Sequence, residues 1–246
     1  MSVKLGLFTM PFHHPDRDYG QILAEDQEAI VLADRLGFTE AFVGEHFSSW
    51  SERITSPLIF LASLASRTKQ ITFGTGVINL PQLHPATVAA HAAMFDHLVR
   101  GRFIMGIGPG GLASDLEMFD LGQPELRPQM VLESIDIILK LWRDDPPYRI
   151  DGRFWNIDLS KHIYPEYKIG WVPRPYQQPH PPIAISLLTP SSNSAKTAGE
   201  AASSRSPETS STDATCAATG RSTSRGAKRR DGDRIRMSGA CHAVCW

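Results

Sequence analysis

The chain has 246 residues, a formal net charge of −1 and 41% hydrophobic residues. This length fits one large domain or two small ones, and the near-neutral charge argues against a chain that is basic throughout and built for nucleic acid. No apolar run reaches the roughly 20 residues of a membrane helix and the N-terminus lacks a signal-peptide layout, so we expect a cytoplasmic protein with neither membrane nor nucleic acid as partner.

Segments typical of strands and helices alternate along the first 200 residues. Short apolar runs predict buried strands, and apolar residues at helical spacing predict helices. In chain order we predict strand 3–9, helix 21–36, strand 40–44, helix 57–66, strand 71–78, helix 86–98, strand 102–107, helix 125–142, strand 182–187 and the start of a helix at 191–200. Before the last strand, Asp151-Gly152 predicts the turn of a hairpin.

This alternation predicts an α/β fold with a parallel sheet, either doubly wound or a (β/α)8 barrel of the TIM type. A dinucleotide-binding sheet needs Gly-x-Gly-x-x-Gly after its first strand, whereas this chain has Thr-Met-Pro-Phe-His-His-Pro-Asp there. The barrel is therefore favoured. Only about five β-α units are visible, so residues 1–200 are predicted to form a barrel domain truncated after the fifth unit.

Residues 201–246 differ in composition from the preceding sequence. All three cysteines, Cys216, Cys241 and Cys245, lie there without metal-ligand spacing, and large apolar residues are scarce. Such a segment cannot offset the entropy of ordering, so we expect a disordered tail. The abrupt change is interpreted as the product of a shifted reading frame near codon 200. A role as a basic nucleic-acid arm is disfavoured, because aromatic residues are not interleaved and acidic residues dilute the charge.

Functional groups of a barrel lie where its strands end. His46 follows the second strand beside Glu45, which favours a catalytic or ligand role. His13 and His14 are interpreted as solvated, and no carboxylate stands at a helical partner position, so we predict no metal site. His84 precedes a proline and either caps the following helix or takes part in function.

Two glycine runs and one serine run also fall at strand ends. Gly74–Gly76 and Gly108–Gly111 would let the backbone approach a flat ring or a phosphate, although glycines relax tight loops anywhere. Ser191–Ser194 lies at a predicted helix start, where serines cap the helix and free N–H groups bind anions.

In this order and spacing the motifs resemble the bacterial luciferase-like flavin monooxygenases, from residue 3 to about residue 200. The residues that carry the resemblance are Gly44-Glu45-His46-Phe47, Gly74-Thr75-Gly76-Val77, Leu80-Pro81, His84-Pro85, Asp96-His97-Leu98, Gly101-Arg102-Phe103 and Gly106-Ile107-Gly108. The resemblance implies a barrel that binds reduced FMN from a separate flavin reductase. It also implies a reaction of that FMN with O2, through a flavin hydroperoxide, to oxidise a small apolar molecule. Family members are commonly dimers, so a homo-oligomer or a related subunit is expected.

The resemblance also assigns roles to single residues. His46, with Glu45 beside it, matches the active-site histidine that supports the hydroperoxide and proton transfer. Residues expected at the cofactor are Phe8 on the pocket floor, Gly76, Val77 and Asn79 at the third strand, Gly108, Pro109, Gly110 and Gly111 after the fourth, and Ser191 and Ser194 at the phosphate-binding turn. Pro109 stands where luciferase has a basic residue that helps hold the phosphate.

Two alternatives to this function stay open. One is a deazaflavin (F420)-dependent oxidoreductase on the same barrel. The other is a truncated, non-catalytic fragment, because an open barrel exposes strand edges and loses one side of the flavin pocket.

Overall fold

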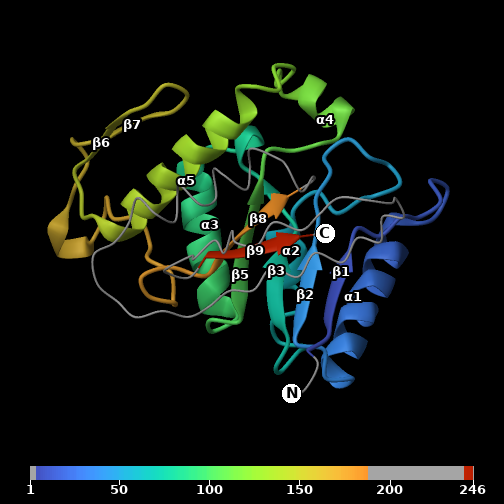
Figure 1. Cartoon of the computed structure of the whole chain (residues 1–246). Coiled ribbons are helices and arrows are strands. Elements are labelled where there is room, and N and C mark those ends of the chain that lie inside the picture. Colours follow the sequence, from blue (N-terminus) through green and yellow to red (C-terminus); the bar gives the residue numbers. More distant parts are fainter. Residues whose placement is uncertain (1–3, 188–240, 246) are drawn as a thin grey trace, which may run out of the picture.

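A parallel sheet forms the centre of the molecule in the computed structural model, which describes residues 4–187 and 241–245 (Figure 1). Its strands lie side by side in the order β1 (Gly6–Thr9), β2 (Glu40–Val43), β3 (Thr72–Thr75), β5 (Phe103–Gly108), β8 (Ile183–Leu187) and β9 (Cys241–Cys245). The short β4 (Ile78–Asn79) also pairs with β5. All of these pairings are parallel, so the predicted α/β class is confirmed.

Helices connect the strands and cover the sheet. They are α1 (Tyr19–Arg35), α2 (Pro57–Ala62), α3 (Pro85–Leu98), α4 (Ala113–Met118) and α5 (Arg127–Arg143). Caps fix where two of them begin: the Asp18 side chain accepts from the Gln21 N–H, and His84 Nδ1 accepts from the Ala86 N–H. Because consecutive strands are neighbours and such connections are right-handed, the connecting helices pack on one face of the sheet, as in a barrel.

The core lies between the strands and these helices. Phe73 and Phe103 from the sheet pack against Phe95 of α3, with ring centroids 6.1 and 4.9 Å from the Phe95 ring. Each of the three rings is at most 2% exposed, which stabilises the fold by about 2–3 kcal/mol per side chain. Trp142 of α5 packs there too, and its indole N–H donates to the Ala89 carbonyl at 3.0 Å.

The predicted strand 71–78 is interrupted. Gly74 pairs with Ile104 and Ile78 pairs with Ile107, so four residue steps on one strand oppose three on the other. The extra residue falls in Thr75–Val77, where the Gly76-Val77 peptide bond is cis. The Thr75 hydroxyl bridges the gap, because it accepts from the Gly106 N–H at 2.8 Å and donates to the Gly106 carbonyl at 2.7 Å.

Several other elements differ from the prediction. α2 is shorter than predicted and α4 was not predicted, whereas the hairpin of β6 (Tyr148–Asp151) and β7 (Asn156–Leu159) is confirmed. Within the segment 201–246, for which we expect disorder, Cys241–Cys245 form β9 and pair with the edge of β8. The expectation for the segment as a whole stays a prediction. The rest of that segment, and the predicted helix 191–200, lie outside the described residues.

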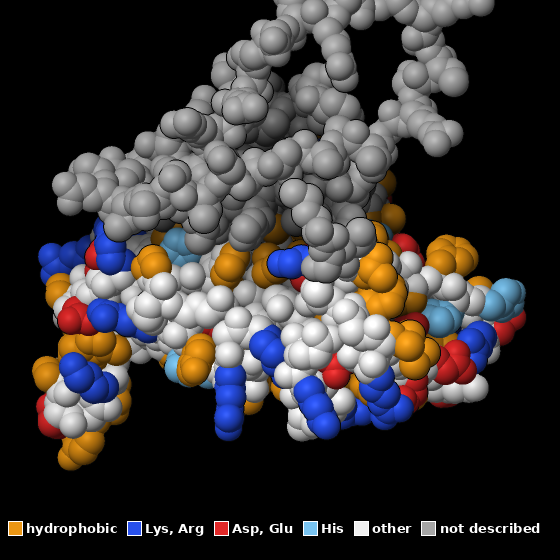
Figure 2. All heavy atoms as spheres, turned by 60° about the horizontal axis from the view of Figure 1, so that its bottom comes forward, with side chains coloured by type: hydrophobic (Ala, Val, Ile, Leu, Met, Phe, Trp, Pro, Cys, Tyr) orange, Lys and Arg blue, Asp and Glu red, His pale blue; other side chains and the backbone are white. Residues whose placement is uncertain are grey.

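At the end of the sheet where the strands begin, the side chains of Asp34 and Arg102 each make three hydrogen bonds. The buried Asp34 carboxylate accepts backbone N–H groups from Lys69, Gln70 and Ile71 at 2.8–3.0 Å. Arg102 donates to Thr68 Oγ1 and to the Ile71 and Ala65 carbonyls. On the face that Figure 2 turns forward, Lys and Arg side chains alternate with acidic and hydrophobic ones.

Candidate functional site

Glu45 and His46 lie directly after β2, at the end of the sheet where the strands finish. Glu45 is 5% exposed, and its Oε1 accepts the Asn79 N–H at 2.7 Å. Burial raises the pKa of this carboxyl to about 8, and Asp115 adds to the rise against the effect of the Asn79 N–H. Glu45 is therefore mainly a neutral carboxylic acid at pH 7 and can donate a proton.

His46 is held by a second carboxylate. Its Nδ1 lies 2.8 Å from Glu52 Oε2, with side chains 16% and 24% exposed, and its backbone N–H donates to the Ile54 carbonyl. A carboxylate on one ring nitrogen fixes the orientation of the imidazole and leaves Nε2 for proton exchange. The sequence analysis missed Glu52, because its pairing depends on the fold of the loop after β2.

Asp115 of α4 joins the loop after β2 to the loop after β5. Its carboxylate, 1% exposed, accepts the N–H groups of Phe47 and Ser48 at 3.0 and 2.8 Å, and Ser48 Oγ also donates to it. The backbone next to His46 is thus anchored to the loop that begins at Gly108. The contact spans 67–68 residues of sequence, so no local pattern could have revealed it.

The third and fourth strands bring further predicted residues to this end. A Cβ on Gly76 would come within 2.9 Å of the Phe8 ring, so only glycine fits beside Phe8, which is 37% exposed. Val77 follows at the cis bond and its side chain lies against Gly108. Asn79 is 6% exposed and lies near Gly110. The structure thus brings together Phe8, Glu45, Gly76, Val77, Asn79, Gly108 and Gly110.

The loop after β5 meets a basic side chain. Gly110 adopts φ +77°, and its carbonyl accepts from Arg127 Nη1 at 2.9 Å. Pro109 has no N–H, whereas the N–H groups of Gly110 and Gly111 make no hydrogen bond within the described part of the chain. Arg127 thus places a cation at the loop where Pro109 places none. An arginine in the first turn of a helix opposes the helix dipole, a signal that could have identified it.

Buried polar atoms without partners gather beside this loop. Arg127 Nε is enclosed and makes no hydrogen bond. Gln82, at the end of η1 (Leu80–Gln82), is 8% exposed, and neither its Nε2 nor its Oε1 has a partner. Its Nε2 lies 3.2 Å from where a Cβ on Gly110 would sit. Buried polar atoms are normally paired, so these three are unusual in one place.

The remaining histidines divide as follows. His14 is exposed as expected, whereas His13 is not solvated: its side chain is 15% exposed and its Nε2 lies 3.0 Å from Asp26. Burial raises the pKa of Asp26, and this effect exceeds the lowering by His13. His84 caps α3, one of the two roles considered. Ser191 and Ser194 lie outside the described residues. Within the described chain, no three His, Cys, Asp or Glu side chains form a set that could hold a metal ion.

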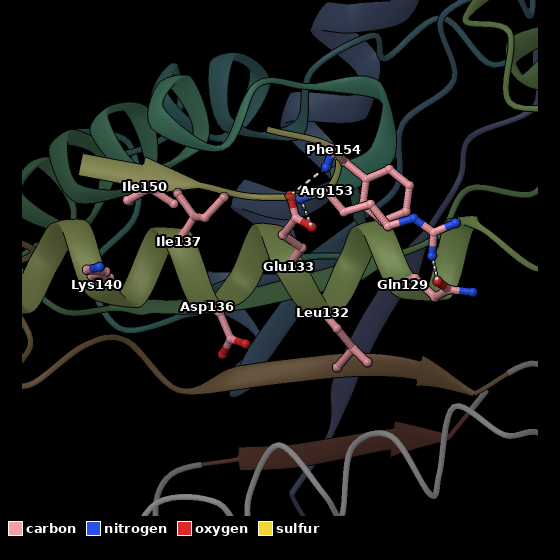
Figure 3. A pocket seen from close by; sticks show the side chains of 9 residues that line it. All are labelled: Gln129, Leu132, Glu133, Asp136, Ile137, Lys140, Ile150, Arg153 and Phe154. Carbon is pink, nitrogen blue, oxygen red and sulfur yellow. Dashed lines mark hydrogen bonds between the residues drawn. The ribbon is translucent and has the colours of Figure 1, made fainter. Parts of the chain in front are cut away.

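A groove lies away from the strand ends. It is a groove of about 460 Å³ between α5 and the hairpin, lined by Leu132, Ile150 and other side chains (Figure 3). Its Glu133 carboxylate accepts the N–H groups of residues 153–155 at 2.8–3.0 Å, and Arg153 donates to Gln129. These polar groups are already paired with one another, so the groove is not the candidate site.

The sequence is similar to those of known proteins. The sequence profile of luciferase-like monooxygenases matches residues 3–245. Limonene 1,2-monooxygenase of Rhodococcus erythropolis is 38% identical over 163 residues, which cover 66% of this chain and 42% of that protein. The oxygenase component of the flavin-dependent trigonelline monooxygenase of Acinetobacter baylyi is 33% identical over 174 residues, 70% of this chain and 45% of that protein. The chain thus spans less than half the length of these two relatives.

A solved structure extends the likeness to the fold. The oxygenating constituent of 3,6-diketocamphane monooxygenase from Pseudomonas putida, in complex with FMN, matches with a TM-score of 0.74 and 28% identity. The match covers 81% of this chain and 55% of that one. Together with the parallel sheet and its one-sided helices, this likeness confirms the predicted barrel class. No described helix has the length and apolar character to cross a bilayer.

Proposed function

This chain belongs to the luciferase-like monooxygenase family, and from that premise we propose that it takes part in an FMN- and O2-dependent oxygenation of a small apolar organic molecule. The observation that carries the proposal is the set of unpaired side-chain atoms of Gln82 and Arg127 around Gly110, which also lies near Asn79, the residue whose N–H donates to Glu45. Relatives named as monooxygenases and the FMN complex of the similar structure support it.

The residues at the strand ends fit a flavin phosphate. Arg127 supplies a positive charge, and the Gly110 and Gly111 N–H groups are donors that no described residue occupies. The carboxyl groups of Glu45 and Asp115 both accept backbone N–H groups, so neither faces the anion without a hydrogen-bond donor of its own. Ser191 and Ser194 remain proposed phosphate ligands by resemblance. When bound, reduced FMN supplies the electrons that reduce O2.

The chain's own residues bind, shield and exchange protons. Phe8 and the Gly76-Val77 backbone offer a surface against which a flat ring can lie, and Asn79 lies beside it. His46, oriented by Glu52, presents Nε2 for proton transfer, and the neutral Glu45 is a second proton source. Of the segment 145–181, the part at Trp155, whose ring centroid lies 5.4 Å from that of His84, is proposed to help exclude water from this end. Gln177 bonds instead to Asp96 and Phe103, where β5 begins.

A reductase partner is suggested by the name of one relative. The trigonelline relative is named an oxygenase component, so we propose that a separate flavin reductase supplies reduced FMN. A homo-oligomer and a cytoplasmic location remain proposals from the family resemblance.

Titration of the purified full chain with FMN, followed by flavin fluorescence, tests the binding step. We expect saturable quenching and weaker quenching with riboflavin, which lacks the phosphate. Oxygen uptake with a flavin reductase, NADH and limonene then tests oxygenation by product analysis, with His46→Ala as the control. Loss of a catalytic proton-transfer group lowers rates by about 10²–10⁴-fold. An absence of flavin binding contradicts the proposal, and preference for the deazaflavin favours the alternative cofactor.

A further inference from the structure

We propose that Gln82 is a cofactor-binding residue whose buried amide recognises the ribityl-phosphate end of FMN. This inference rests on the proposed function and names a residue to which neither the sequence motifs nor the family resemblance gave a role. It starts from a buried side chain with two unpaired polar atoms, 8% exposed in total.

An unpaired buried amide needs a physical explanation. Leaving such a group without partners destabilises a folded protein, and an apolar side chain of similar size would avoid that loss. Elsewhere in the chain even a half-buried glutamine finds partners: Gln177 donates from Nε2 to Asp96 Oδ1 and to the Phe103 carbonyl. The amide of Gln82 is therefore expected to hydrogen-bond either an enclosed water molecule or a polar group of a ligand.

The neighbours of Gln82 define what that ligand group is. Arg127 Nε and Gln82 Nε2 are donors without partners, and the N–H groups of Gly110 and Gly111 find no acceptor among residues 4–187 and 241–245, so the site requires several acceptor oxygens. Gln82 Oε1 is a single acceptor among them and requires one donor. A phosphate group next to a hydroxyl meets both needs, and the ribityl-phosphate chain of FMN carries that combination.

The position of Gln82 follows from the fold. η1 begins immediately after β4, so its last residue lies just beyond the end of the strand. η1 packs against α5, which begins at Arg127, and the Gln82 amide lies on the Gly110 side. A ligand that occupies the loop after β5 therefore comes within reach of both side chains.

Gln82→Leu separates this role from a structural one, because the two predict opposite results. The variant removes two unpaired polar atoms, so its melting temperature without flavin should equal or exceed that of the unchanged chain. Its dissociation constant for FMN should rise about tenfold, the usual effect of losing one hydrogen bond to a charged group. Its affinity for riboflavin should change less, because riboflavin lacks the phosphate.

Gln70→Leu is the matched control at the opposite end of the sheet. The Gln70 amide donates to the Asp34 and Phe38 carbonyls, so this variant should lower the melting temperature and leave the preference for FMN over riboflavin unchanged. Gln82→Glu adds a second test, since a carboxylate there should repel the phosphate and weaken FMN binding more than Gln82→Leu does.

Two results would overturn the proposal. One is a Gln82→Leu variant whose melting temperature falls as that of Gln70→Leu does and whose FMN affinity is unchanged. That result would mean that the Gln82 amide binds an enclosed water molecule. The other is equal loss of FMN and riboflavin affinity in both Gln82 variants. If the unchanged chain binds no flavin, the proposed function fails, and inorganic phosphate then tests Gln82 alone. Phosphate should raise the melting temperature of the unchanged chain but not of Gln82→Leu, and no rise in either contradicts the inference.

Discussion

The two ends of the sheet differ in how completely some of their buried polar side chains are hydrogen-bonded. Where the strands begin, Asp34 accepts three N–H groups and Arg102 donates to three oxygens. Where the strands end, the buried Glu45 accepts one N–H, Gln82 has no partner and Arg127 has an unpaired Nε.

This difference separates stability from function within one sheet. Paired buried groups stabilise the fold, whereas unpaired ones are kept where a ligand can pair them. In barrels, residues at the end where strands finish build the active site and those at the other end contribute to stability. Substitutions where the strands begin should therefore change unfolding alone. Where the strands end, those of paired groups such as Asp115 should change stability, and those of Glu45 and Gln82 should change pH dependence or binding.

The largest effect is expected from Glu45→Gln as a function of pH. Glu45 binds its proton with a pKa near 8 in the folded chain and near 4.5 when unfolded, so folding takes up a proton between these values. Stability of the unchanged chain should thus fall, relative to the variant, by on the order of 4 kcal/mol as pH rises from 4.5 to 9. Urea unfolding at several pH values measures this, and parallel profiles would contradict it.

Asp34→Ala tests the end where the strands begin. It leaves three N–H groups without an acceptor, so the free energy of unfolding should fall by about 3 kcal/mol, with flavin affinity unchanged. Burial alone would raise the pKa of Asp34, but the three N–H groups and Arg102 hold it below its usual value. The destabilisation should therefore shrink as pH falls through that lowered pKa. Asp16→Ala, at an exposed carboxylate, is the control in urea unfolding.

Asp115→Asn should destabilise the loop after β2 by about 2 kcal/mol, because Phe47 and Ser48 donate to different carboxylate oxygens and the amide NH2 that replaces one of them cannot accept. Amide hydrogen exchange should show faster exchange at these two positions and little change near Asp34. The exposed Glu117→Gln on the same helix is the control. Unchanged exchange at Phe47 would mean that Asp115 does not anchor the loop.

His84→Ala is expected to give the smallest effect. Loss of this cap should cost about 1 kcal/mol of stability and leave FMN affinity unchanged, although His84 lies at the same end of the sheet as His46. Thermal unfolding together with FMN titration checks both expectations. A large loss of FMN affinity would assign His84 to the binding site and contradict its role as a helix cap alone.

Local patterns in the sequence predicted most of the framework. Apolar runs and capping residues predicted the strands and α1, α3 and α5 to within a few residues, because these elements depend on short-range periodicity. α4 was missed because it is six residues long and has no side-chain cap. The strand 71–78 was predicted as continuous because residue types do not reveal an extra residue in the register.

The site was predicted only where residues follow a strand directly. Glu45, Asn79 and Gly110 come together because parallel strands finish at one edge. Glu52, Asp115, Gln82 and Arg127 were missed because their roles depend on partners that tertiary packing supplies, or leaves out. A pattern of residue types contains no information on which buried atoms lack a hydrogen bond.

The extra residue between β3 and β4 also sets the phase of the side chains that follow. Successive strand residues alternate between the two faces of a sheet, so one inserted residue exchanges the faces of everything after it. Within this segment Gly76 faces Phe8; beyond it, Ile78 enters the hydrophobic core and Asn79 lies toward Gly110. Deleting one residue from 75–77 would turn Asn79 into the apolar layer and expose Ile78 at the end of the sheet where the strands finish.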